Sequence, residues 1–381
     1  MPRSQLLFTI MLAAAGGIVA WQATTQSQQQ TPGLPGARPA IDAANYTSLQ
    51  AAIDALPPTG GVVRLPAGTF EIDQPLRITQ EDVLLEGSGT ATHVKNMNAH
   101  GQPAIVIESP KIKEDPKAVL WRVQIANLRV TGNEKSGPGI LVRHVNEIFL
   151  HGITVSYHGG DGVQLDNCYE DPRICDCLLT YNKAHGLNLI GCHDIVVVGN
   201  QFEENLDALR CADSFNLCMT GNNLDDHLRD GVVIENTYGS VVSGNMIEEC
   251  NGRAIVLDRD CYGITLSANV IAHNGGGIDL VDAHGCAVSA NTFTINKANG
   301  LKVGPASGRI TVTGNSFSSS FIGDGKDKRQ ETDRSAAGIV LSGTSQITIV
   351  GNTFTGLTTK AIAQEGGSLR EVLIDANAIQ D

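Results

Sequence analysis

Apolar and polar residues alternate in short runs along most of the chain, as in GIDLVDAHGCAVSANTF at residues 277–293. A period of two is typical of β-strands with one buried face, and no unit of the chain holds a helical stripe of about ten residues. A small residue followed by an aliphatic one marks each unit, and successive marks are 23, 24, 22, 23, 23, 23, 23, 38 and 23 residues apart. The marks are Gly139-Ile140, Gly162-Val163, Gly186-Leu187, Ala208-Leu209, Gly231-Val232, Ala254-Ile255, Gly277-Ile278, Gly300-Leu301, Gly338-Ile339 and Ala361-Ile362. The pattern predicts an array of β units of about 23 residues.

Asparagine recurs in the same phase, after Gly or Ala and two residues before Phe, Leu or Ile. The positions are Asn200, Asn222, Asn245, Asn269, Asn291, Asn315, Asn352 and Asn377. A unit this short cannot enclose a core, so each unit must stack on the next and form an all-β solenoid. Stacking puts equivalent residues ~4.8 Å apart. We therefore expect each asparagine amide to bond to the asparagines above and below it.

The ends of the repeat array and one insertion have their own patterns. The stretch YTSLQAAIDALPP predicts a short N-terminal helix opened by Thr47, with Gln50 completing a capping box. Such a helix would cover the open end of the solenoid. The spacing of 38 contains an insertion at residues 318–337, rich in charge and glycine, which predicts a surface loop.

Residues 45–89 include AAID, GGVVRLPAGTF and LLEGSG, and the later units carry the repeated Gly-Asn pairs. Here the chain resembles right-handed parallel β-helix proteins of the pectate-lyase-like superfamily. The resemblance covers nearly all of the chain after residue 40 and implies a right-handed parallel β-helix. Proteins of this fold include lyases, hydrolases, epimerases and proteins without catalysis, so the resemblance carries no catalytic residue over to this chain.

The composition of the chain indicates its cellular compartment and excludes one class of partner. Residues 1–23 combine Arg3 with an uncharged stretch and small residues, as a signal peptide does, and the Gln- and Pro-rich residues 24–40 read as a linker. Residues 41–381 are then one domain. We expect a monomer that is secreted, periplasmic or on the cell surface, without a membrane span once the signal is removed. The net charge of −13 argues against nucleic acid as a partner.

Nine cysteines are present, an odd number for an exported chain. Cys168 and Cys192 occupy equivalent positions of consecutive units, which suggests a disulfide. Cys211 is expected as a core thiol. The sequence Cys175-Asp176-Cys177 is weak evidence for a metal, so no metal site or cofactor is predicted, although calcium bound by acidic groups stays open. His193, His273 and His284 are expected to be isolated at the surface.

A charged column is the strongest functional signal. If the small residue of each unit is position zero, +1 and +3 point inward, whereas −1, +2 and +4 are predicted to face solvent. Five consecutive units carry an ionisable residue at −1, namely Asp161, His185, Asp207, Asp230 and Arg253. Polar residues of the neighbouring columns and of the turn DDHLRDGVVI extend the surface. They are Gln164, Asn188, Arg210, Glu235, His227 and Arg229.

Such a surface suits a polysaccharide, which is bound by hydrogen bonds and transformed by acid–base chemistry. We take Asp161, His185, Asp207, Asp230 and Arg210 as candidate catalytic residues and assign substrate binding to the others. Stacking predicts ~5 Å between Asp207 and Asp230, as in a retaining glycosidase, with one carboxyl protonated by mutual repulsion. Asp161 and Asp207 would lie ~9.5 Å apart, near the upper end for an inverting enzyme.

Two alternatives use the same residues. In the first, Arg210 or Arg253 neutralises a uronate while His185 removes a proton, which gives β-elimination or epimerisation. In the second, the chain binds a glycan or another surface partner without catalysis, and the alternating charges form a structural ladder. Aromatic residues that could stack on sugars are few near the column, with Tyr169, Tyr181 and Tyr238 as the candidates.

Overall fold

The computed structural model describes residues 34–318, 337–357 and 359–380. The chain divides into two compact units, Met1–Ala37 and Arg38–Asp381, and every strand of the described residues lies in the second. The predicted signal peptide, most of the predicted linker and nearly all of the predicted insertion lie outside the described residues. No helix among the described residues is long and apolar enough to cross a membrane.

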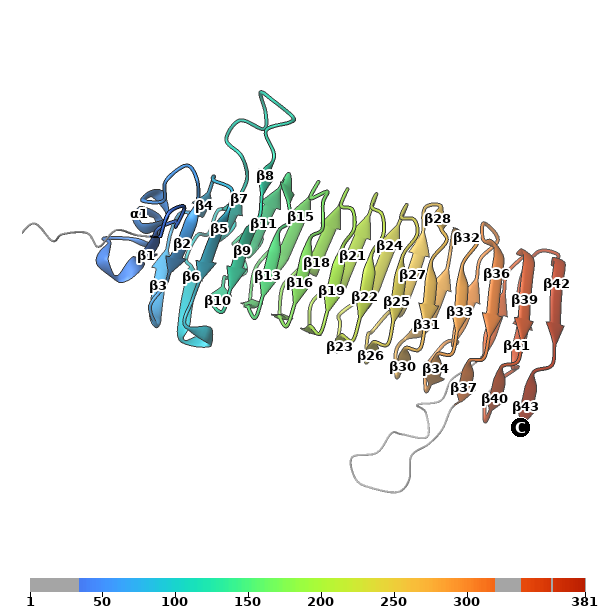
Figure 1. Ribbon diagram of the computed structural model, residues 1–381. Helices are drawn as coiled ribbons and strands as arrows, with labels where there is room; N and C mark the ends of the chain where they lie inside the picture. Colours follow the sequence, from blue (N-terminus) through green and yellow to red (C-terminus); the bar gives the residue numbers. More distant parts are fainter. Residues whose placement is uncertain (1–33, 319–336, 358, 381) are drawn as a thin grey trace, which may run out of the picture. The chain divides into compact units, whose positions relative to one another are not determined.

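Three parallel sheets, A, B and C, run the length of the second unit, and Figure 1 shows their strands stacked side by side in chain order. Sheet A holds β1 (Ala40–Asp42), β2 (Gly61–Arg64), β5 (Val83–Glu86), β9 (Val123–Ala126), β13 (Phe149–His151), β16 (Arg173–Cys175), β19 (Val196–Val198), β22 (Cys218–Thr220), β25 (Val241–Ser243), β29 (Thr265–Ser267), β33 (Ala287–Ser289), β36 (Gly308–Thr313), β39 (Ser345–Val350) and β42 (Arg370–Asp375), with β28 (Cys261–Tyr262) and β32 (Ala283–His284) joined through β36.

Sheet B holds β3 (Gly68–Ile72), β6 (Thr92–Asn96), β10 (Arg129–Thr131), β14 (Thr154–Ser156), β17 (Leu178–Thr180), β20 (Gln201–Glu203), β23 (Asn223–Asp225), β26 (Met246–Glu248), β30 (Val270–Ala272), β34 (Thr292–Thr294), β37 (Ser316–Ser318), β40 (Thr353–Thr355) and β43 (Ala378–Gln380). Sheet C holds β4 (Leu76–Ile78), β7 (Ile105–Ile107), β11 (Ile140–Arg143), β15 (Val163–Asp166), β18 (His185–Ile190), β21 (Asp207–Ala212), β24 (Val232–Glu235), β27 (Arg253–Asp258), β31 (Gly276–Leu280), β35 (Leu301–Val303), β38 (Ile339–Leu341) and β41 (Ile362–Gln364). The short strands β8 (Leu120–Trp121) and β12 (Val145–Asn146) pair with each other.

The register of sheet C is the register that the repeat predicts. Val163 pairs with Leu187, and Leu187 with Leu209, so each +1 residue lies over the +1 residue of the previous coil. The +1 and +3 side chains of these coils are fully buried, as are Phe202, Phe293 and others in sheet B. Burying each such side chain contributes about 1.5–3 kcal/mol relative to exposure. The all-β solenoid expected from the alternation is confirmed.

The predicted asparagine column is present. The Nδ2 amide of Asn200 donates to Oδ1 of Asn222 at 3.0 Å, and Asn222 donates in turn to Asn245 at 2.9 Å. The same bond continues coil by coil to Asn377. Each Oδ1 also accepts from the main-chain N–H of the preceding asparagine, so the turn is held to its neighbour twice. We call this series the asparagine ladder.

A short helix, α1 (Leu49–Asp54), is present near the first coil, with two 3-10 turns, η1 (Ala43–Asn45) and η2 (Gly89–Ala91). The predicted cap is wrong by one residue, because Ser48 accepts from the Ala51 N–H at 3.1 Å. Gln50 does not close a capping box. Its side chain instead bonds to the main chain of Arg77 in β4, which ties the helix to the solenoid.

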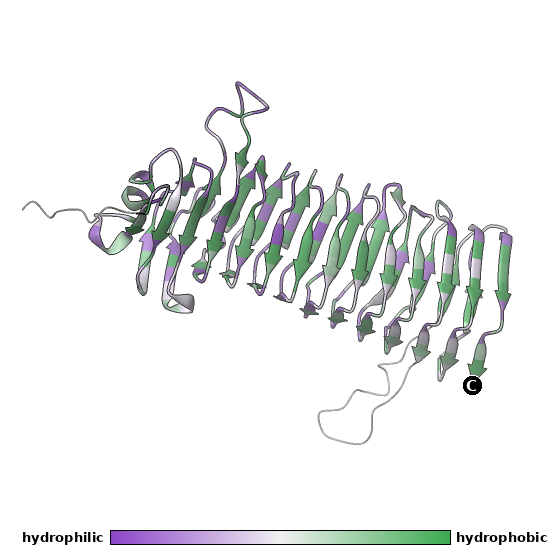
Figure 2. Cartoon of the chain, in the orientation of Figure 1, coloured by the Kyte–Doolittle hydropathy of each residue, from purple (hydrophilic) through white to green (hydrophobic). Residues whose placement is uncertain are grey.

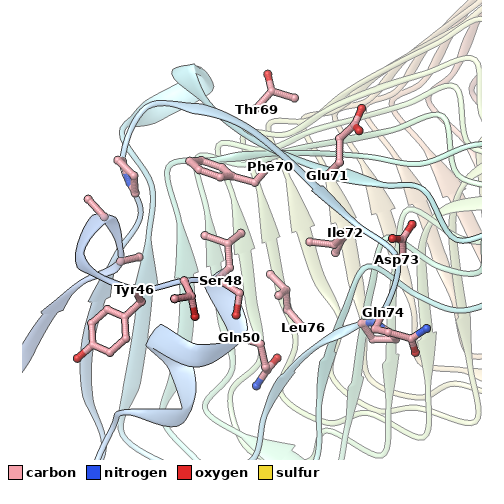
Figure 3. A pocket seen from close by; sticks show the side chains of 16 residues that line it. Tyr46, Ser48, Gln50, Thr69, Phe70, Glu71, Ile72, Asp73, Gln74 and Leu76 are labelled. Atoms are coloured by element: carbon pink, nitrogen blue, oxygen red, sulfur yellow. The ribbon is translucent and has the colours of Figure 1, made fainter.

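Beside this helix lies a hollow of 690 Å³, shown in Figure 3. Tyr46, Gln50, Phe70 and Glu71 are among the residues around it. It lies in the first coils of the chain, away from the predicted charged column.

All nine cysteines are free thiols in the structure, so the predicted disulfide between Cys168 and Cys192 is wrong. Both thiols are fully buried in the core, where Cys168 Sγ donates to the Val142 carbonyl at 3.9 Å and Cys192 Sγ donates to the Leu165 carbonyl at 3.6 Å. Cys211 is a buried core thiol as predicted, and burial raises its pKa to about 12.

Candidate functional site

The charged column lies at the start of successive strands of sheet C. His185 and Asp207 are register partners in β18 and β21, and Arg253 begins β27. Figure 2 shows hydrophilic positions interrupting the otherwise hydrophobic strands in the middle of the stack. The three carboxylates of the column are more buried than expected for solvent-facing residues. Asp161, Asp207 and Asp230 are 7, 0 and 3% exposed, because neighbouring cations and amides cover them.

Asp161 orients the histidine of the next coil. Its Oδ1 accepts from the main-chain N–H of His185 at 3.0 Å and lies 2.8 Å from His185 Nδ1, while Oδ2 accepts from Asn188 Nδ2 at 2.9 Å. The imidazole Nε2 lies 3.4 Å from Asp207 Oδ2. The arrangement fixes the ring and leaves Nε2 with a single, long contact to a carboxylate.

Asp207 and Asp230 are each bound by an arginine from the following coil or turn. Arg229 donates from Nε to Asp207 at 2.8 Å and also from its terminal nitrogen. Arg253 donates from Nε and a terminal nitrogen to Asp230 at 3.1 and 3.0 Å. Each of the two carboxylates therefore has its own arginine partner.

Arg210 and Glu235 form a third pair further along the same strands. Arg210 donates from Nε to Glu235 at 2.8 Å, and its terminal nitrogen lies 3.5 Å from Asn188 Oδ1. Asn188 thereby joins this pair to Asp161. The structure thus brings together ten of the eleven predicted site residues on or beside sheet C, and Gln164 lines a hollow of 280 Å³ in the preceding coils.

The exception is His227, whose predicted placement at the surface is wrong. It is fully buried, and its Nδ1 accepts from the main-chain N–H of Asn205 at 3.3 Å. It occupies one rung of a second interior column whose other members are His158, Asn182, Asn205, Cys250, Asn274 and Asn296. Burial lowers the pKa of His227 to about 4, so the ring is neutral and has a structural role.

An aromatic ladder runs beside the charged surface, and only two of its rings, Tyr169 and Tyr238, were predicted near the column from the sequence. Its rings follow sheet C at the corner towards sheet A. They are Tyr169, His193, Phe215, Tyr238 and Tyr262. The first four lie 5.2, 5.6 and 5.5 Å apart between centroids, and Arg309 lies over Tyr262 at 5.5 Å. His193 is thus not isolated. The signal was available, because these residues are 22–24 positions apart.

Tyr157 and Tyr181 form a parallel stack at the opposite corner of sheet C, with centroids 5.1 Å apart. They line a hollow of 380 Å³ with Lys183 and Leu228, which precedes Arg229 in the turn. Tyr157 and Leu228 are 55% exposed. The charged surface therefore has ring or apolar surface on both sides.

Acidic residues gather on the sheet B side of the same coils. Asp225, Asp226 and Glu249 have carboxylate oxygens within 4.8 Å of one another. Burial and the neighbouring Asp226 carboxylate raise the pKa of Asp225 to about 6. The turn DDHLRDGVVI is crowded with charge because its residues point in three directions: to this acidic cluster, to the core and to the charged surface.

Family models and solved structures agree with this architecture. A model described as "Right handed beta helix region" matches residues 80–208. The A-module of a mannuronan C-5 epimerase from Azotobacter vinelandii is similar over 89% of this chain and 99% of its own, with 17% identity and a TM-score of 0.68. The chain is a parallel β-helix repeat protein. No curated protein sequence matches it.

Other similar structures have different activities on the same fold. The catalytic unit of an alpha-1,3-glucanase from Streptomyces thermodiastaticus has a TM-score of 0.61 and 17% identity, covering 91% of the β-helix chain and 69% of its own. PfbA, a surface adhesin of Streptococcus pneumoniae, has a TM-score of 0.55 and 13% identity, covering 85% and 91%. At these identities the likeness shows the fold alone.

A second family model, "Periplasmic copper-binding protein (NosD)", matches residues 183–369. A copper site in this segment would need imidazole or sulfur ligands close together. In the described part of the segment, the two groups of three or more ligands that could share an ion are Asp260, Asp282 and His284, and Asp225, Asp226 and Glu249. Both are mainly carboxylates, whereas copper prefers imidazole and sulfur ligands. The described residues of this segment therefore do not fit a copper site.

Proposed function

We propose that the β-helix is an exported enzyme that acts on a uronate-containing polysaccharide by proton abstraction beside the sugar carboxylate. The outcome would be β-elimination or epimerisation. The observation that carries the proposal is the placement of His185, which Asp161 orients through Nδ1 while Nε2 faces the charged surface. In this role His185 removes the proton and Asp161 positions it.

Arginine supplies the second requirement of this chemistry, which is stabilisation of charge on the carboxylate of the sugar. Arg229 is the best placed, because half of its side chain is exposed beside Asp207 and His185. Arg210 and Arg253 are more fully engaged by Glu235 and by Asp230 with Asp279. Arg229 would therefore bind the uronate, and the other two would hold the surface rigid.

An extended substrate is favoured by the shape of sheet C. A hollow of 280 Å³ lined by Arg77, Arg143 and Gln164 precedes the charged surface, and another of 600 Å³ lined by Lys302 and Lys360 follows it. Both contain cationic side chains, which suits a polyanion. A mannuronan epimerase is among the similar structures, and the NosD family is described as periplasmic, in keeping with export.

The test is a product assay with the purified protein on a panel of polyuronates. Unsaturated ends would be followed by ultraviolet absorbance, epimerised residues by proton NMR and new reducing ends by a sugar assay. We expect His185→Gln to reduce kcat at least about 100-fold, the usual contribution of a general base. His100→Gln, an exposed histidine of the early coils, is the matched control and should retain full activity.

The proposed role of Arg229 predicts a loss in both substrate binding and chemistry. Arg229→Gln should raise KM and lower kcat together, because a uronate neutraliser acts in both the ground and transition states. Retention of wild-type kcat by His185→Gln would overturn the proton-abstraction proposal. Release of reducing ends without unsaturation would indicate hydrolysis instead.

A second candidate is glycan binding without turnover. The specific observation in its favour is that the carboxylates of the surface are already paired with arginines, while the aromatic ladder offers ring faces for sugars. In that case no substrate of the panel would be converted. Tyr238→Ala would weaken glycan affinity, by about 1–2 kcal/mol per lost ring contact, while His185→Gln would leave it unchanged.

A further inference from the structure

A mixed set of metal-binding side chains lies on the outer face of sheet A, apart from the charged surface. His151 in β13 and Cys175 in β16 are register partners, so their side chains leave the sheet on the same face of adjacent coils. Asp176 follows directly in the left-handed conformation, with φ of 53°. One ligand atom from each of the three residues lies within 4.8 Å of the other two.

The local geometry explains why Cys175 and Cys177 do not present their two thiols to the same metal ion. The turn at Asp176 sends Cys177 inwards, where it is 3% exposed and its Sγ donates to the carbonyl of Cys175 at 3.1 Å. The preceding coil supplies His151 in its place. A two-cysteine motif in the sequence thus becomes a histidine, a thiol and a carboxylate in the structure.

The side chains of His151, Cys175 and Asp176 already lie close enough together to share a cation. His151 Nε2 lies 3.3 Å from Asp176 Oδ2, so the carboxylate already faces the ring. Tetrahedral zinc would bring the ligand atoms to roughly 3.3–3.8 Å from one another, given its usual bond lengths. The three ligand atoms lie within 4.8 Å of one another, at most about 1.5 Å beyond these separations.

We propose that His151, Cys175 and Asp176 form a binding site for a borderline divalent metal ion such as zinc(II), with its fourth position open to solvent. Imidazole, thiolate and carboxylate are all zinc ligands, whereas calcium and magnesium take oxygen alone. The site lies outside residues 183–369, so the copper-binding family model does not cover it. It does not depend on the proposed function.

The experiment uses protein that has been reduced and treated with a chelator. Zinc(II) binding is measured by calorimetry, and cobalt(II) is used as a spectroscopic probe, because a thiolate ligand gives a sulfur-to-cobalt charge-transfer band. We expect one ion per chain. Cys175→Ser should abolish the band, and Cys175→Ser and His151→Gln should each weaken zinc(II) binding at least about tenfold.

Cys218→Ser is the matched control, since Cys218 is an exposed thiol on the same sheet, in β22. It should leave stoichiometry, affinity and the cobalt band unchanged. The proposal is overturned if wild-type protein binds no zinc(II), or if Cys175→Ser and His151→Gln bind it as tightly as wild type. Circular dichroism of each variant confirms that the β-helix is folded when binding is measured.

Discussion

At the scale of single residues, two buried histidines have a consequence for acid stability. His158 and His227 are fully buried, and burial lowers the pKa of each to about 4. In the unfolded chain the pKa is about 6.5. The unfolded state therefore binds more protons between these values, so stability is complete above pH 6.5 and falls as the pH drops towards 4.

We expect asparagine at both positions to remove most of this acid sensitivity. Asparagine already occupies equivalent rungs of the same interior column, as at Asn182 and Asn205. The double variant His158→Asn/His227→Asn should lose less stability between pH 7 and pH 4.5 than wild type, by a few kcal/mol for the two sites together. Urea unfolding at both pH values measures this. Equal pH sensitivity would assign the effect to other groups.

The residues also show what the sequence could reveal of the site. The −1 column was predictable, because one marker per coil fixes the phase and Asp161, His185 and Asp207 fall in it. The prediction for His227 was wrong because its charged neighbours indicate an exposed turn, whereas its spacing of 22–24 residues from Asn205 and Cys250 places it in their interior column. Burial of the carboxylates depends on where long arginine side chains fold back, and no local pattern encodes that.

At the scale of the element, the asparagine ladder should be a main source of stacking energy. Asn245 accepts from the side chain and main chain of Asn222 and donates to Asn269 and to the Met219 carbonyl. Asn245→Leu would leave several buried polar groups without partners, each worth about 1–3 kcal/mol.

We expect Asn245→Leu to lower the free energy of unfolding by roughly 3 kcal/mol or more, measured as a shift in the urea midpoint. The control is Asn223→Leu, an outward residue of β23 whose amide bonds only to Gln201 at 3.0 Å. Its effect should stay within about 0.5 kcal/mol. Similar losses in the two variants would show that the interior bonds contribute little.

Some features of the coils could be predicted from the sequence, whereas others could not. Coils, inward residues and the asparagine ladder follow from a period of about 23 and were predicted. The aromatic ladder has the same period but mixes Tyr, His and Phe, so a search by residue type did not detect it. The His151–Cys175–Asp176 set joins two coils and depends on the turn at Asp176, which only the structure supplies.

At the scale of the whole molecule, each coil contacts mainly its neighbours, so stability is expected to vary along the stack. The strands near the end of the described chain are the least buried, with Leu373, Ile374 and Ile379 about half exposed. The central strands have fully buried cores. Hydrogen exchange should therefore be slowest for amides of β18, β21 and β24 and fastest for those of β42 and β43. Uniform protection along all coils would indicate a single cooperative unit.

The asparagine ladder also gives the stack a direction. Every bond between two asparagine side chains of the ladder, from Asn200 to Asn377, runs from the amide of one coil to the Oδ1 of the coil of higher residue number. The dipoles are aligned, so each bond polarises the next. Two such stacks joined face to face by a twofold axis would set like poles against each other, whereas a head-to-tail arrangement would continue the series.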